Sequence, residues 1–227
     1  MIEAVVFDAY GTLLDVHAAM QRHAGELPPD WERISTEWRT KQLEYTWITT
    51  LTGPSHYRDF WTITEASLDY VLQRHRVTDP AVRAALLETY RELPAFPDAK
   101  PTLATLRSMG LKTAILSNGE PKMMEAAVGA AGIGGLLDAV ISVDLIKTYK
   151  PSTTVYALAE RTLGVAASQT GFVSSNAWDA QGAAVAGFQV FWCNRGGNPA
   201  EYGLEHRATV IDSLADLEAM LAKEAQA

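Results

Sequence analysis

A short apolar run near the amino terminus, followed at once by an acidic residue and then a glycine, constrains the fold most. The run covers residues 4–7, enough for one fully buried strand of a parallel sheet. Asp8 stands where the run stops, and in an open α/β sheet the carboxyl ends of the strands face the ligand crevice. Gly11 permits a tight turn, and Thr12 adds a hydroxyl beside Asp8. Asp8 is therefore a candidate catalytic carboxylate, with capping of the turn as the alternative.

The rest of the chain alternates strands with helices and is interrupted once. Further strands are predicted at 112–116, 139–142, 170–173, 189–192 and 209–211. The helices that separate them are predicted at 102–109, 153–163 and 180–186, with another after strand 112–116 and a last one from Ser213. This order is typical of an α/β fold with a doubly wound, mostly parallel, Rossmann-like sheet.

The interruption lies between the first two strands and is helical. Its spaced apolar residues predict helices at 31–47 and 61–75, and a third with Asp79 as N-cap and Pro80 as its first residue. We therefore expect a core domain made of residues 1–14 and 95–227, with a helical cap domain inserted at 15–94.

Composition narrows the possible partners and the compartment. The chain has 227 residues with a formal net charge of -8 and no basic patch, which argues against nucleic acid. An anionic substrate would have to be captured by local Lys and Arg side chains. Cys193 is the only cysteine, which fits a reducing cytoplasm. We find no signal-peptide pattern and no apolar run near the roughly 18 residues of a membrane span, so we expect no membrane association.

Polar residues follow several of the predicted strands. Ser117 and Asn118 end the second strand, and Lys150 opens the helix after the third. The fourth strand ends in Ser174, with Asn176 and Asp179 just beyond, so these groups meet Asp8 at one edge of the sheet. Each is weak evidence alone, because such residues also form turns, solvated surfaces and helix starts.

Taken in order, these residues resemble the four motifs of the haloacid dehalogenase superfamily, over the whole chain. The segments around Asp8, Arg39, Ser117, Lys150 and 173–179 resemble its L-2-haloacid dehalogenase branch most closely. Magnesium-dependent phosphatases of the superfamily carry acidic residues where this chain has Tyr10 and Ser174. A halide leaves as a stable anion, so its departure needs no general acid. A carboxylate nucleophile can displace it and form an ester that water then cleaves.

The resemblance implies a role for each residue. Asp8 is the nucleophile, and Arg39 of the cap receives the halide. Ser117, Asn118 and Thr12 hold the substrate carboxylate or the Asp8 oxygens. Lys150 and Ser174 orient Asp8, while Asn176 and Asp179 position Lys150 or the hydrolytic water. The apolar wall and the supporting network comprise Tyr10, Leu43, Phe60, Trp178 and Tyr156.

These roles predict a cytoplasmic, homodimeric hydrolase that converts a 2-haloacid to a hydroxyacid and a halide ion. No cofactor or metal is expected, and the five histidines lack metal-ligand spacing. Two alternatives stay open: a phosphatase of the same superfamily, and a non-catalytic relative that binds small anions. Without the resemblance, Arg39 on an amphipathic helix would be interpreted as a surface charge. Phe60 and Trp178 are equally consistent with simple core residues.

Overall fold

Strands of four to six residues, mostly buried, form a six-stranded parallel sheet in the computed structural model, which describes residues 1–224. The strands stand in the order β3-β2-β1-β4-β5-β6, and every neighbouring pair is parallel. Their bounds are β1 Ala4–Phe7, β2 Lys112–Ser117, β3 Ala139–Ser142, β4 Thr170–Ser174, β5 Gln189–Cys193 and β6 Ala208–Ile211. This confirms the predicted α/β class and parallel sheet.

The first strand of the chain lies inside the sheet, between β2 and β4. Its four residues are fully buried, which explains the unbroken apolar run. Phe7 pairs with Ile115 on one side and Val173 on the other, and the Asp8 N–H continues the ladder to the Val173 carbonyl at 2.9 Å. Asp8 therefore leaves the sheet between the ends of β2 and β4.

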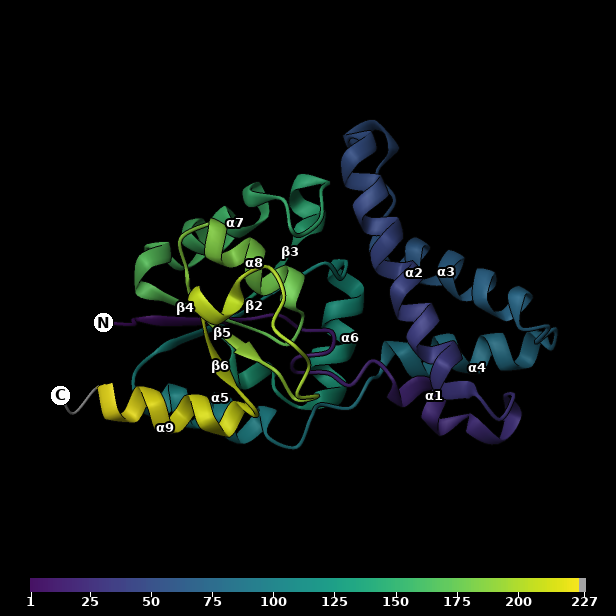
Figure 1. Ribbon diagram of the computed structural model, residues 1–227, viewed down its shortest axis with the longest axis horizontal. Helices are drawn as coiled ribbons and strands as arrows, with labels where there is room; N and C mark the ends of the chain where they lie inside the picture. Colours follow the sequence, from purple (N-terminus) through teal and green to yellow (C-terminus); the bar gives the residue numbers. More distant parts are fainter. Residues whose placement is uncertain (225–227) are drawn as a thin grey trace.

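Five helices pack on the sheet in the described part of the chain. In Figure 1, α7 and α8 lie over one face, and α5 and α9 lie over the other. The bounds are α5 Ala99–Ser108, α6 Pro121–Ala131, α7 Thr153–Leu163, α8 Ala177–Val185 and α9 Leu214–Glu224. Covering both faces buries the strands and confirms the doubly wound arrangement.

The insertion between β1 and β2 is helical and stands beside the carboxyl ends of the strands (Figure 1). It contains α1 Ala18–Arg22, α2 Trp31–Thr52, α3 Phe60–Arg74 and α4 Pro80–Arg91. The α2 and α3 helices pack along each other through buried apolar side chains such as Ile34 and Leu68. Burying each such side chain stabilises the folded chain by roughly 1.5–3 kcal/mol relative to leaving it in water. Short 3-10 turns complete the chain at Ala24–Glu26, Pro54–His56, Gly134–Leu136, Val143–Ile146, Ala167–Gln169 and Leu204–His206.

The helix boundaries differ from the prediction in ways that have local causes. The α5 helix starts at Ala99 rather than 102, with Pro101 in its first turn. Backbone N–H groups in the first turn make no bond within the helix, so a proline, which has no N–H, is tolerated there. The α8 helix starts at Ala177 rather than 180, which places Asp179 in its first turn. The α1 helix was not predicted, since five residues are too few to show a period. Asp79 caps α4 as predicted, accepting from the Ala81 N–H at 2.8 Å.

The chain leaves and re-enters the core at two adjacent connections. The Asp15 N–H donates to the Pro94 carbonyl at 2.9 Å, and the Phe96 N–H donates to the Leu13 carbonyl at 2.8 Å. An isolated bridge joins Leu14 to Ala95 between them. We propose on this support that residues 15–94 are the cap domain, with 1–14 and 95–227 as the core domain.

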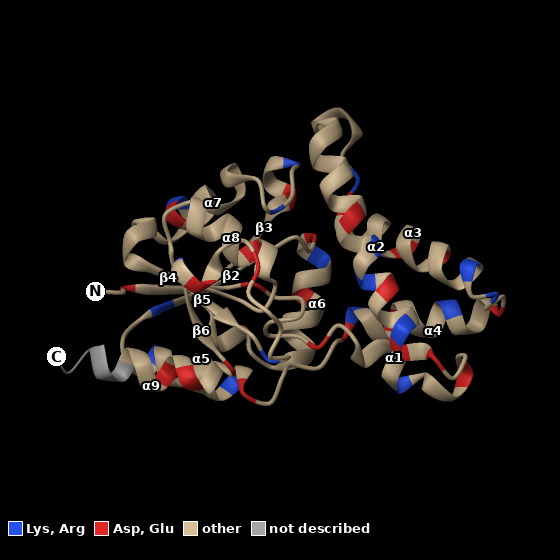
Figure 2. Ribbon diagram, viewed as in Figure 1, with Lys and Arg blue, Asp and Glu red and all other residues tan. Residues whose placement is uncertain are grey.

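Charges are spread over the surface helices in the described part of the chain. Figure 2 shows Lys and Arg interspersed with Asp and Glu along α2, α3 and α4, and again along α5 and α9. In residues 1–224, none of the helices is both long and apolar enough to cross a membrane.

Candidate active site

The Asp8 carboxylate is held by the nearby Thr12 and by two side chains from distant parts of the chain, Lys150 and Asn176. Its Oδ2 accepts from the Thr12 hydroxyl at 3.1 Å and from Asn176 Nδ2 at 2.8 Å. Its Oδ1 accepts from the Lys150 ammonium at 3.1 Å. The Ser175 N–H donates to the Thr12 hydroxyl oxygen at 2.8 Å, so the hydroxyl proton is directed at Asp8. Asp8 is only 5% exposed, so this carboxylate is oriented and shielded from water.

Lys150 links Asp8 to a second buried carboxylate. Its ammonium donates to Asp179 Oδ2 at 2.9 Å, and Asp179 Oδ1 accepts from the Tyr156 hydroxyl at 2.7 Å. Burial alone would lower the pKa of Lys150, but Asp179 and Asp8 outweigh burial and raise it. Burial and the nearby Asp8 charge raise the pKa of Asp179, and Lys150 offsets this only in part. Lys150 therefore stays charged between the two carboxylates.

Arg39 reaches the site from the inserted helices. It lies on α2, and its Nη2 donates to the Tyr10 carbonyl at 3.0 Å. Asn176 Nδ2 also approaches that carbonyl, at 3.3 Å. The guanidinium is partly buried and contacts the Tyr10 carbonyl, two residues beyond Asp8 in the loop that follows β1.

Ser117, Asn118 and Ser174 do not bond to Asp8 in the structure but order the backbone around it. The Ser117 hydroxyl accepts from the Gly119 N–H at 3.0 Å, and Asn118 Oδ1 accepts from the Lys150 N–H at 3.1 Å. In both contacts the side chain accepts through its oxygen. The Ser117 hydroxyl proton and the Asn118 side-chain N–H groups therefore stay available as donors. The Ser174 hydroxyl accepts from the Asn176 N–H at 3.1 Å and so acts through Asn176.

Aromatic and aliphatic side chains surround the polar centre. The Tyr10 ring lies 5.6 Å from the Phe60 ring and 5.8 Å from the Tyr90 ring. Burial raises the pKa of Tyr10 well above its usual value, so the phenol is neutral. Leu43 is buried one turn beyond Arg39 on α2.

Trp178 and Tyr156 lie on different sides of this centre. Trp178 packs edge-on against Trp47 of α2, and both line an apolar groove of about 650 Å³ between α2 and α8. Tyr156 is fully buried behind Asp179 and accordingly supports the carboxylate network.

The sequence did not reveal two groups that position site residues. Gln42 and Tyr90 bond to each other beside Arg39, with the Tyr90 hydroxyl donating to Gln42 Oε1 at 3.1 Å. Arg195 pairs with Asp98 through bonds of 2.7 and 2.9 Å and donates to the Thr12 carbonyl at 3.3 Å. No motif or periodicity marks Tyr90, Asp98 or Arg195, because their partners are distant in sequence. Gln42 lies in the segment around Arg39 that carries the resemblance, but the sequence alone predicts no role for it.

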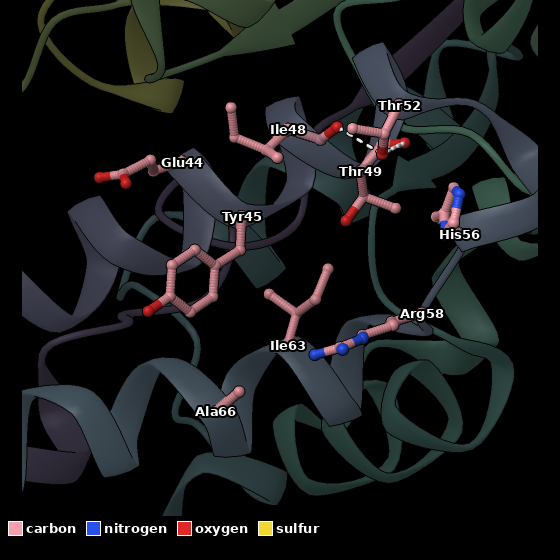
Figure 3. A pocket seen from close by; sticks show the side chains of 9 residues that line it. All are labelled: Glu44, Tyr45, Ile48, Thr49, Thr52, His56, Arg58, Ile63 and Ala66. Carbon is pink, nitrogen blue, oxygen red and sulfur yellow. Dashed lines mark hydrogen bonds between the residues drawn. The ribbon is translucent and has the colours of Figure 1, made fainter.

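A second depression, on the inserted helices, is separate from this site. It has a volume of about 880 Å³, and Figure 3 shows it between α2 and α3, with Tyr45, Ile48 and Arg58 on its walls. None of the residues around Asp8 lines it. Residues 1–224 also contain no group of three or more His, Cys, Asp or Glu side chains that could hold a metal ion.

A buried, oriented carboxylate thus stands at a strand end and pairs with a lysine, and an arginine from the inserted helices contacts the loop that follows the strand. The family model for haloacid dehalogenase-like hydrolases matches residues 2–187. The chain is 44% identical to (S)-2-haloacid dehalogenase 4A of Burkholderia cepacia, over 98% of this chain and 96% of that protein. It is 43% identical to (S)-2-haloacid dehalogenase 1 of Pseudomonas sp. strain CBS-3, over 99% of each chain.

A solved structure extends the comparison. The L-2-haloacid dehalogenase of Xanthobacter autotrophicus, with chloropropionic acid covalently bound, superimposes with a TM-score of 0.88 at 38% identity. The match covers 98% of this chain and 99% of that one. The chain therefore belongs to the haloacid dehalogenase-like hydrolases and, within them, to the (S)-2-haloacid dehalogenase family.

Proposed function

We propose that this protein is a hydrolase acting on carbon–halide bonds, which converts an (S)-2-haloalkanoate and water to an (R)-2-hydroxyalkanoate, halide and a proton. The observation that carries the proposal is the Asp8 carboxylate, buried and held by Thr12, Asn176 and Lys150. A phosphatase of the superfamily would need a general acid for its leaving oxygen. This chain has Tyr10 at that position, and burial raises the pKa of Tyr10 well above its usual value, which makes the phenol a poor proton donor.

In the first step an Asp8 oxygen displaces the halide from C2. Oδ1 accepts one hydrogen bond and Oδ2 accepts two, so Oδ1 keeps a lone pair for attack on carbon. Its electron pair forms the new C–O bond while the carbon–halogen bond breaks and the halide leaves with that pair. The product is an ester on Asp8, and the single in-line displacement inverts C2.

Arg39 receives the departing halide on the side opposite Asp8. A guanidinium carries five N–H donors, and the bonds to Gln42 and Tyr10 engage two of them. The remaining donors and the permanent charge suit a halide ion in a partly buried site. The Ser117 hydroxyl and the Asn118 amide supply donors for the substrate carboxylate, which fixes the halogen toward Arg39.

In the second step water attacks the ester carbonyl carbon of Asp8, and the bond between that carbon and the oxygen on C2 breaks. That oxygen leaves as the product hydroxyl with one proton of the water, and the other proton is released. The carbonyl oxygen is then Oδ2, which already lies between the Thr12 hydroxyl and Asn176 Nδ2. These fixed donors stabilise the negative charge that develops on this oxygen. The C2–O bond is not touched in this step, so the configuration set by the first step is kept. The Lys150 ammonium, which donates to Asp8 Oδ1 at 3.1 Å, faces the regenerated carboxylate.

We also propose that turnover needs no divalent cation. Mg²⁺ prefers several hard oxygen ligands in octahedral geometry. Asp8 and Asp179 are the two carboxylates that contact Lys150, and its ammonium bridges them at 3.1 and 2.9 Å. This donor set supports a metal-independent reaction.

Halide release from (S)-2-chloropropanoate, measured in the presence of EDTA, tests the function. Wild-type protein should release chloride and form only the (R)-hydroxyacid, while Asp8→Asn should fold normally and release none. Strong magnesium-dependent hydrolysis of p-nitrophenyl phosphate without chloride release would instead identify a phosphatase. Absence of both activities would leave an anion-binding relative.

A single turnover in water enriched in oxygen-18 tests the ester. The product hydroxyl should carry light oxygen, because that atom comes from Asp8, and the label should enter Asp8. Over many turnovers the label should pass through Asp8 into the product. Heavy oxygen in the hydroxyl on the first turnover would show direct attack of water on C2.

We also propose that the enzyme is a homodimer and that it works in the cytoplasm. Cys193 is buried and unpaired, as expected in a reducing compartment. Leu51 and Val185 are exposed apolar side chains on the groove beside Trp178, which supports contact with a second copy. Sedimentation equilibrium should give twice the chain mass, and a monomer mass would remove this part of the proposal.

A further inference from the structure

A buried amide lies directly behind the Arg39 guanidinium. Gln42 is 1% exposed and follows Arg39 by three residues on α2. Its Oε1 accepts from Arg39 Nη1 at 2.7 Å and from the Tyr90 hydroxyl at 3.1 Å. Gln42 therefore binds one terminal nitrogen of the Arg39 guanidinium, Nη1, while the Tyr10 carbonyl binds the other, Nη2.

The orientation of this amide is fixed by its third partner. Gln42 Nε2 donates to the Thr64 hydroxyl oxygen at 2.7 Å, and the Thr64 hydroxyl itself donates to the Phe60 carbonyl at 2.7 Å. Because the Thr64 proton is already used, its oxygen is an acceptor toward the amide. The Gln42 oxygen must then face Arg39 and Tyr90, which are both donors.

Tyr90 holds the same oxygen from α4. Its ring packs 4.9 Å from Trp38 and stacks 5.8 Å from Tyr10, and it is 2% exposed. Burial raises the pKa of Tyr90, and this outweighs the nearby Arg39 charge, which lowers the pKa. The Tyr90 hydroxyl therefore stays protonated and can donate a hydrogen bond. The amide is thus clamped by α2, α3 and α4 together.

The neutrality of Gln42 matters for the charge of its neighbour. A carboxylate at this place would form a bidentate pair with the guanidinium and compete with any other anion. An amide oxygen orients the guanidinium and leaves its full positive charge available. The same hydrogen bond therefore fixes the direction of Arg39 without occupying its anion-binding capacity.

We propose that Gln42 is the positioning residue that aims Arg39 at the departing halide, acting through a neutral hydrogen bond held by Thr64 and Tyr90. The inference rests on the proposed function, since it takes Arg39 as the halide acceptor. It adds that halide capture depends on an amide that touches neither substrate nor Asp8.

The consequence concerns the leaving group. Bromide departs more readily than chloride, so the displacement of chloride depends more on a well-aimed cation. Loss of the Gln42 bond should therefore slow a chloro substrate more than a bromo substrate. The KM should change little, because the substrate carboxylate is held elsewhere.

Bromide binding without turnover gives the first test. We expect calorimetric titration of Gln42→Glu with sodium bromide to give a Kd at least tenfold above that of wild type. Thr46→Val is the matched control, because Thr46 is buried on the same helix and its hydroxyl bonds only to the Leu43 carbonyl among the described residues. Its Kd should equal that of wild type.

Gln42→Met gives the second test, since it removes the amide at nearly equal length. Its kcat for (S)-2-chloropropanoate should fall at least tenfold, its kcat for the bromo analogue less than threefold, and both KM values should stay within threefold. Thr46→Val should change both kcat values by one common factor. Tyr90→Phe, which removes one donor to Oε1, should show a smaller effect of the same kind and serves if either Gln42 variant fails to fold.

The outcomes separate this inference from the proposed function. Equal bromide affinity in wild type and Gln42→Glu, or an unchanged chloro-to-bromo ratio in Gln42→Met, overturns the role of Gln42 even if the wild type is a dehalogenase. Absence of bromide binding in the wild type overturns it as well. Bromide binding lost in the variant, with no dehalogenation by the wild type, upholds the geometry while refuting the proposed reaction.

Discussion

Replacing Lys150 with methionine removes the ammonium that separates two buried carboxylates and keeps a side chain of similar length. The Lys150 side chain is 1% exposed, and its nitrogen lies 3.1 Å from Asp8 Oδ1 and 2.9 Å from Asp179 Oδ2. The two oxygens are thus at most about 6 Å apart, and at an effective dielectric constant of about 20 two such charges repel by about 3 kcal/mol. Breaking a buried pair costs about 3–5 kcal/mol, so we expect Lys150→Met to lose stability in that range.

The loss should depend on pH in a defined direction. Burial already raises the pKa of Asp179 in the wild type, and removal of the ammonium, which lowers that pKa, raises it further. A folded-state pKa above the unfolded value means that stability falls as pH rises from about 4 to the folded pKa and is then constant. The free energy of unfolding of Lys150→Met should therefore lie furthest below that of the wild type at pH 8, and the difference should shrink toward pH 4.

Urea unfolding of both proteins between pH 4 and 8 measures this deficit, and halide release at pH 8 measures the accompanying loss of activity. Lys147→Met is the matched control, because Lys147 is an exposed lysine of the same segment that pairs with Asp144. It should change stability by less than about 1 kcal/mol. A deficit below 1 kcal/mol for Lys150→Met, or one that grows toward pH 4, refutes the reasoning.

Three further predictions concern neighbouring contacts. Gly182→Ala should lower stability by about 1–3 kcal/mol in thermal melts, because the added Cβ would overlap the Tyr156 hydroxyl; an unchanged Tm would contradict the packing. Tyr156→Phe should lower kcat without changing bromide affinity, since it removes a donor from Asp179 and leaves the Arg39 side intact; a weaker bromide Kd would contradict this. Burial lowers the pKa of His17, so stability should fall as pH drops below about 6.5, where the unfolded chain gains the proton first. His17→Asn should flatten this dependence in urea titrations, and an unchanged slope would contradict it.

The sheet and its polar edge were predictable because they follow from local patterns. Each buried strand is a short apolar run, and parallel strands end at one edge, so Asp8, Ser174 and Asn176 could be placed together before any coordinates. The position of Lys150 after β3 follows from the same rule. The structure adds which atoms meet, such as Asn176 Nδ2 and Asp8 Oδ2.

The contacts of the inserted helices were not predictable in the same way. Arg39 was singled out through resemblance alone, since an arginine on an amphipathic helix has no local mark of function. Gln42, Thr64 and Tyr90 come from α2, α3 and α4, and their meeting depends on how these helices cross. Periodicity gives the buried face of one helix but not the partner of a polar atom on it.

The place of β1 in the sheet imposes an order on synthesis. This strand leaves the ribosome first, yet its partners are β2 at Lys112–Ser117 and β4 at Thr170–Ser174. The apolar segment 4–7 must therefore wait for roughly three quarters of the chain, while α2 and α3, neighbours in sequence, can pair at once. A nascent chain stalled before β4 exposes one edge of β1 and has an Asp8 without Asn176 or Asp179. We expect such a chain to be inactive and to bind chaperones that recognise extended apolar segments.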